Sequence, residues 1–173
     1  QLRQSQVVTT FGPGAMVDLI DRAVLIGGLE HWGWGKQGFV ALDAARLWHE
    51  LEPSVHALQV LAATLVAAKR VDEAGPVIEK LFSAEGVNRE NAFMQLNRLL
   101  AGNADKAANQ RVVRNIAAKY PELPQAHFAI AQAAALAGDN EAAIAAAREA
   151  QKLRPDWELA VLLEAQVLLQ RSP

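Results

Sequence analysis

Histidines near the middle of this sequence are the first side chains that could bind a metal ion or move a proton. His49 and His56 flank Pro53, so a turn at the proline could bring the two imidazoles together. Zinc sites need three or four converging donors, and no carboxylate or cysteine follows at a convincing ligand spacing. We therefore predict that the protein has no metal site.

A second group of candidate catalytic residues lies near the N-terminus. Asp18 and Asp21, with Glu30 and His31, could form an acid-base cluster, although turn or surface roles are sufficient to explain them. The glycine-rich residues 12–14 lack the Lys-Ser/Thr ending of a phosphate loop and the spacing of a dinucleotide fingerprint. The chain has no cysteine, which excludes thiol catalysis and disulfides. We predict a protein that is not an enzyme and holds no cofactor.

Composition limits the partners of the protein. The 173 residues carry a formal net charge of −2 with acids and bases mixed throughout, so we expect no nucleic-acid binding. No apolar run reaches the roughly 18 residues of a membrane span, and the start lacks the basic-then-apolar order of a secretory signal. As the chain stands, we expect a cytoplasmic location. Alanine supplies much of the 51% hydrophobic content, which favours close packing of helices.

The elements that must position any site repeat along the chain with a period of about 34 residues. The clearest copy spans residues 124–155, in which small residues recur at helical spacing on both sides of Gly138 and Asp139. Glycine tolerates a positive φ at a helix end and aspartate caps the next helix, so this pair predicts a tight turn. Two helices joined by a short turn at this period are typical of a tetratricopeptide array.

The repeat predicts the architecture of most of the chain. We expect an all-α, right-handed helical solenoid of antiparallel helix pairs over residues 37–173, preceded by an extended or β-like segment at 1–36. The middle repeat is the least regular, because Asn97 and Asn109 stand where small residues are expected. The solenoid divides into a half repeat at 37–53, full repeats at about 55–88, 90–121 and 124–155, and a final helix at 156–170.

From about residue 39 to 170 the chain resembles tetratricopeptide-repeat proteins of proteobacteria. The resemblance is carried by AARLWHELEP at 44–53, KYPELPQAHFA at 119–129 and LRPDWE at 153–158. Members of this family include outer-membrane lipoproteins that serve as binding partners of periplasmic proteases. The resemblance implies a non-enzymatic protein-interaction scaffold, in the periplasm or attached to the outer membrane if the lipoprotein likeness holds. It also implies that His127 occupies a packing position.

In this family the first helices of successive repeats line a concave groove that binds a peptide or a partner helix. Arg98 is the only strong cation at the corresponding positions, so we do not expect a clamp for a peptide's carboxylate. Amides mixed with Met94 and Phe128 favour an uncharged peptide or an amphipathic helix. The alternative is that Met94 and Phe128 pack against further helices that this sequence does not contain. The predicted groove residues are Gln59, Asn91, Met94, Arg98, Gln125, Phe128 and Gln132, and the wider set adds His56, Ala63, Val66, Ala101, Ala135, Leu159, Leu162 and Gln166.

The first 34 residues carry a different resemblance. RQSQVVTTFGPGAMVDL at 3–19 and GLEHW at 28–32 are similar to the start of the helicase-associated component of the DISARM anti-phage system. This implies an alternative function, in which the chain is a fragment or fusion of a phage-defence component and the repeats mediate its assembly. The half repeats at both ends of the solenoid also leave apolar faces uncovered, so we predict self-association through the terminal helices.

Overall fold

The computed structural model describes residues 37–171 of the chain and the side chains of residues 41–170. Every element in this part is helical, which confirms the all-α prediction for it. The predicted β-like segment at 1–36, its acid-base cluster and its resemblance to a phage-defence component lie outside the described residues. The elements are α3 (Gln37–Leu51), α4 (Val55–Ala67), α5 (Val71–Ser83), α6 (Arg89–Leu99), the 3-10 turn η2 (Leu100–Gly102), α7 (Lys106–Ala117), α8 (Pro124–Ala137), α9 (Asn140–Leu153) and α10 (Glu158–Arg171).

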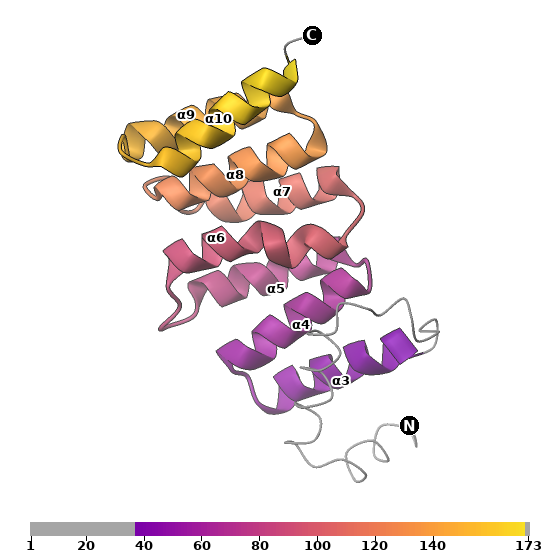
Figure 1. Cartoon of the computed structure of the whole chain (residues 1–173). Coiled ribbons are helices and arrows are strands. Elements are labelled where there is room, and N and C mark those ends of the chain that lie inside the picture. The colour runs from indigo at the N-terminus through magenta and orange to yellow at the C-terminus, as the bar shows by residue number, and fades with distance from the viewer. Residues whose placement is uncertain (1–36, 172–173) are drawn as a thin grey trace.

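The helices recur in a constant register. Helices α4, α6, α8 and α10 begin at residues 55, 89, 124 and 158, which are 34, 35 and 34 residues apart. Helices α3, α5, α7 and α9 begin at residues 37, 71, 106 and 140, with the same three spacings of 34, 35 and 34. In Figure 1 the first series forms a front layer, with α5, α7 and α9 behind it. This register defines the tetratricopeptide type of helical solenoid.

Short polar side chains set where four of these helices begin. Ser54, Asn88, Asp105 and Asp139 each accept a hydrogen bond from the backbone N–H three residues later, at 2.9 to 3.2 Å. Such caps satisfy N–H groups that have no partner inside the helix, and each contributes about 1 kcal/mol. Gly138 ends α8 with a φ of 79°, so the predicted Gly138-Asp139 turn is confirmed.

An aromatic cluster joins the first complete repeat to the second. The Phe93 ring of α6 is fully buried and lies edge-on to Phe82 of α5, with 4.6 Å between the ring centroids. Tyr120, in the linker after α7, contacts the same ring at 5.6 Å and donates a hydrogen bond from its hydroxyl to the Phe82 carbonyl. Three elements of the array therefore depend on one buried side chain.

Buried asparagines account for the irregular middle repeat. Asn109 of α7 donates to the Leu100 carbonyl at 2.9 Å and accepts from the Asn103 side chain at 2.9 Å. Asn103 also donates to the Asp105 carbonyl at 3.0 Å. These bonds fix η2, which replaces the glycine turn of the next repeat. An amide therefore stands where a small residue was expected because the turn needs its hydrogen bonds.

Removal of the Asn109 amide should lower the stability of the protein measurably. We expect Asn109→Ala to lower the free energy of unfolding by about 1–3 kcal/mol, because it removes two buried hydrogen bonds, one to the Leu100 carbonyl and one from the Asn103 amide. Urea denaturation followed by circular dichroism measures the change. Asn115→Ala, on an exposed position of the same helix, is the matched control and should stay within about 0.5 kcal/mol of the parent protein. Equal effects of the two substitutions would contradict this role for Asn109.

Candidate functional site

A cleft opens where the front layer of helices diverges. Helix α6 packs closely along α8, whereas α4 meets the end of α6 only near η2, and Figure 1 shows α4 crossing α6 at a clear angle. The resulting cavity has a volume of about 470 Å³ and is floored by Ile78, Leu81 and Phe82 of α5. This volume lies within the roughly 300–1,000 Å³ of typical ligand sites. The residues at 86–88, between α5 and α6, close one end of it.

The walls of the cleft are apolar with a rim of amides. Gln59 of α4 stands on one wall, and Asn91 and Gln95 of α6 stand on the other. All three are exposed, and no partner for their side-chain amides is found within residues 41–170. An amide offers both a donor and an acceptor, so these groups can hydrogen-bond a peptide backbone. Among the described residues, the lining contains no charged or titratable side chain.

Gln59 and Asn91 are the two predicted groove residues that the structure brings together on one cleft. Gln95 belongs to the same site and was not predicted. It follows Asn91 by four residues, so the two side chains lie on one face of α6 and this face turns toward α4. That spacing could have identified Gln95 in the sequence. It was missed because positions transferred from the family favour Met94, one residue earlier.

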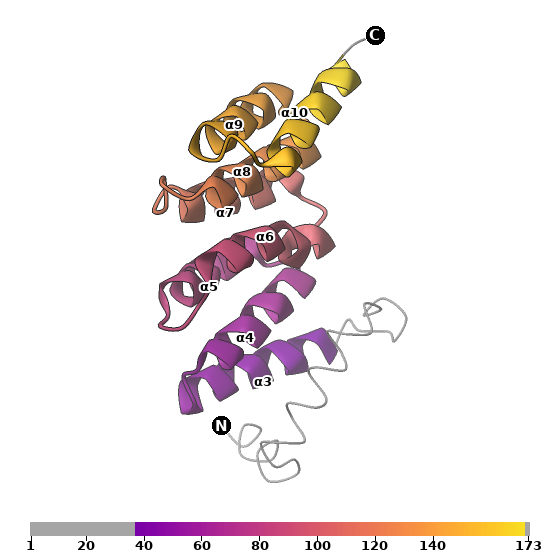
Figure 2. The ribbon, with the colours of Figure 1, turned by 60° about the vertical axis from the view of Figure 1, so that its left-hand side comes forward.

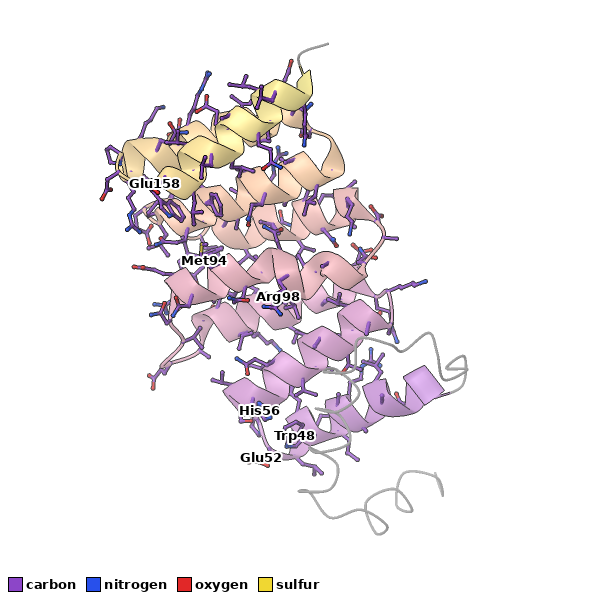
Figure 3. The ribbon with its side chains drawn as sticks, viewed as in Figure 1. Trp48, Glu52, His56, Met94, Arg98 and Glu158 are labelled. Atoms are coloured by element: carbon purple, nitrogen blue, oxygen red, sulfur yellow. The ribbon has the colours of Figure 1, made fainter. Side chains whose placement is uncertain are left out.

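Met94 and Arg98 lie elsewhere on α6. Met94 is half-buried and packs against the cluster formed by Phe128, Trp157 and their alanine neighbours. Arg98 is exposed, and within the described part of the chain it has no hydrogen-bond or ion-pair partner. Figure 3 shows both side chains on the front layer, but neither belongs to the lining of the cleft.

Gln132 serves the packing of α6 on α8. The side-chain amide of Asn97 donates to the Ala129 carbonyl at 2.9 Å and to the Gln132 side-chain oxygen at 3.2 Å. Both side chains are half-buried. The asparagine that looked irregular in the sequence therefore connects two neighbouring repeats. The close contact it supports on this side contrasts with the open cleft on the other side of α6.

Two predicted groove residues are buried, which corrects their expected place on an open surface. The Phe128 side chain is 4% exposed, and its ring lies 4.8 Å from that of Trp157, just before α10. Gln125 is 6% exposed and donates to Glu90 at 3.1 Å. The alternative interpretation placed Phe128 against helices outside this sequence, whereas the ring packs on Trp157 of the same chain. Helix α10 starts at residue 158, two residues later than expected.

The histidines do not form a metal centre in the described part of the chain, where no group of three potential ligands is found. His127 is half-buried, and its Nε2 lies 2.9 Å from the Pro121 carbonyl oxygen. His56 lies edge-on to Trp48 at 5.3 Å, at the turn between α3 and α4 seen in Figure 3. Both side chains therefore have structural contacts.

Two carboxylates with a lowered pKa, Asp139 and Glu149, lie at the other end of the molecule from the cleft. A hydrogen bond from Gln110 lowers the pKa of Asp139, which is the cap of α9. A hydrogen bond from Lys152 lowers the pKa of Glu149. These are surface pairs on α7 and α9, and neither carboxylate lines the cleft. The cleft therefore offers apolar contact and neutral hydrogen bonds rather than acid-base chemistry.

Comparison with known proteins gives a partial match to one family. Residues 3–86 match the model of a domain of unknown function (DUF8724). The match runs through α3, α4 and α5 and stops before α6, so its end falls between the two walls of the cleft. No curated protein sequence matches the chain.

A solved structure titled "MamA RS-1 ArsTM double mutant" aligns with the chain at a TM-score of 0.49 and 16% sequence identity. The alignment covers 91% of this chain and 85% of the other. The helix register described above identifies the protein as a helical-repeat solenoid. No helix of residues 37–171 is long and apolar enough to cross a membrane.

Proposed function

We propose that the protein is a non-enzymatic interaction scaffold that binds an uncharged, largely apolar peptide segment of a partner protein in the cleft between α4 and α6. The observation that carries this proposal is the lining of the cleft. Its floor is formed by Ile78, Leu81 and Phe82, its rim by exposed amides, and no charged side chain of the described part enters it. Apolar pockets with a few polar groups are the usual form of a binding site.

An extended peptide suits the cleft better than a helix. The backbone groups of a helix already bond to one another, so they have little use for the rim amides. An extended segment presents free N–H and C=O groups, which Gln59, Asn91 and Gln95 can hydrogen-bond while alternate side chains enter the apolar floor.

The chemistry of the lining supports binding without catalysis or a carboxylate clamp. Nucleophilic and acid-base catalysis use side chains such as Ser, Cys, His, Asp, Glu and Lys, and none of these lines the cleft in the described part. Arg98, the only strong cation among the predicted groove residues, lies outside the lining. The peptide is therefore recognised along its backbone and apolar side chains rather than by its terminal charge.

Selection of peptides from a random display library on the full chain tests this function. We expect selected peptides to be apolar and to bind Gln59→Trp at least about tenfold more weakly than the parent protein, because the indole fills the cleft. Fluorescence anisotropy of labelled peptides measures the affinity. Asn115→Trp, an exposed position on α7, is the control and should bind normally.

A second variant separates this cleft from the groove expected across α6 and α8. Arg98→Glu should leave the affinity of the selected peptides unchanged, since Arg98 does not line the cleft. Strong loss of binding in Arg98→Glu, with normal binding by Gln59→Trp, would reject the α4/α6 cleft as the site. Circular dichroism of each variant confirms that the helices are intact.

A further inference from the structure

Helix α10 carries apolar side chains on two opposite sides. Ala160 and Val167 are buried against the preceding helices, with Leu163 half-buried beside them. On the opposite side, Leu162 is 62% exposed and Leu169 is 75% exposed. Five of the eight exposed large hydrophobic residues in the described part belong to this helix. The α10 face is defined by these five residues: Leu159, Val161, Leu162, Leu168 and Leu169.

Such a helix is expected to be covered on both sides. A helix that borders solvent normally has one apolar stripe and one polar face, and a helix that is apolar all round is normally buried. Within residues 37–171 no other helix covers the α10 face, which lies on the upper front edge of the array in Figure 1. Figure 2 shows the same helix on the outer side of the stack.

We propose that the α10 face is a self-association surface, on which two copies of this chain pair their α10 helices in antiparallel orientation about a two-fold axis. Its area fits a weak, reversible dimer. A fully exposed leucine presents roughly 150 Å², somewhat less than an aromatic side chain. The five side chains, about half exposed, then offer at most roughly 400 Å² per copy and 800 Å² per pair. This total lies at the low end of protein interfaces, where association is weak and reversible.

The charges of α10 are compatible with pairing of identical faces. From Leu159 to Gln170 its sequence holds one charged residue, Glu164. This carboxylate accepts hydrogen bonds from Arg148 and Gln151 of α9, both at 2.7 Å, so it lies at the packed edge. Each copy therefore brings an uncharged face to the contact, and no like charges meet on it.

The antiparallel orientation follows from the first turn of the helix. Glu158 is exposed at the start of α10, as Figure 3 shows. A parallel pair would place two Glu158 carboxylates and two helix N-termini side by side. An antiparallel pair separates the carboxylates by most of the helix length and opposes the helix dipoles favourably. Leu162 and Ala165 then lie near the two-fold axis, and each meets the same patch of the partner.

Sedimentation velocity of the full chain, from about 1 to 100 µM, tests the proposal. We expect the parent protein to shift from monomer to dimer over this range, and Leu162→Glu and Leu169→Glu to remain monomeric. Leu51→Glu is the matched control, because Leu51 is 70% exposed at the end of α3, away from α10. It should dimerise like the parent. A monomeric parent protein throughout would overturn the proposal and leave the face to a different protein or to another segment of chain.

A cross-linking experiment tests the same pairing with a substitution that adds no charge to α10. The chain has no cysteine, so a single introduced thiol reports on contact between copies. Ala165→Cys should form a disulfide-linked dimer on mild oxidation, because residue 165 lies near the axis, whereas Leu51→Cys should not. Equal cross-linking of both variants, or dimers in Leu162→Glu as in the parent, would equally reject pairing through α10.

Discussion

Phe93→Ala is expected to lower the free energy of unfolding by about 3–5 kcal/mol, the usual cost of deleting a fully buried phenylalanine. The ring is 0% exposed and contacts Phe82 and Tyr120 at 4.6 and 5.6 Å. Removal leaves a cavity between α5, α6 and the linker before α8, where the surrounding helices cannot close up without losing their register. Urea denaturation followed by circular dichroism measures the loss.

The position of Phe93 in the array adds a second expected result. A solenoid is stabilised by contacts between neighbouring repeats. Weaker packing between two repeats in its middle therefore allows the two halves to unfold separately. The transition should therefore broaden and its urea dependence should become shallower. Phe93→Leu keeps most of the volume and should retain a single sharp transition. A Phe93→Ala protein that unfolds as sharply as the parent, at nearly the same urea concentration, would contradict this account.

Because Phe82 lies between the Phe93 ring and the cleft, the same substitution connects stability to function. Phe82 forms part of the cleft floor and has its ring 4.6 Å from Phe93. We infer that the aromatic cluster holds this floor rigid. The selected peptides should then bind Phe93→Ala more weakly than Phe93→Leu, even though neither substitution touches the cleft lining directly.

The regular parts of this fold could be predicted from the sequence because their signals are local. Apolar residues recurring at helical spacing place α8 and α9 at the predicted residues 124–137 and 140–153. Gly138 and Asp139 mark the turn between them through backbone φ and capping, which depend only on neighbouring residues. The helical spacing recurs in every pair even where the turn differs, so the period of the solenoid follows directly from the chain.

The position of the cleft could not be predicted in this way, because it depends on contacts between distant residues. A repeat pattern treats every pair of neighbouring helices alike, whereas α6 is held to α8 by Asn97 and diverges from α4. The burial of Phe128 is decided by Trp157, which lies 29 residues further along the chain. Of the groove positions transferred from a family, Gln59 and Asn91 line the α4/α6 cleft, whereas Phe128 is buried.

Phe128→Ala should cost the last helices about 3–5 kcal/mol of packing energy while leaving α4 to α6 intact. Phe128 is 4% exposed, and its ring packs against Trp157, which is 9% exposed just before α10. Terminal repeats of a solenoid can unfold without the rest. We expect faster amide hydrogen exchange in α9 and α10 than in the parent protein, with unchanged exchange in α4 and α5. Leu136→Ala, at an exposed position of α8, should change neither.

This variant also separates the two proposed surfaces. If peptides bind in the α4/α6 cleft and copies pair through α10, Phe128→Ala should bind peptides with the parent affinity and yet fail to dimerise. Loss of peptide binding with α4 to α6 still protected from exchange would instead show that the partner site extends over α8, as the family groove implies. If α10 exchanges rapidly in Phe128→Ala and the protein still dimerises, the pairing of α10 helices is rejected. The two surfaces lie at different places on the array, so one substitution can lose one activity and keep the other.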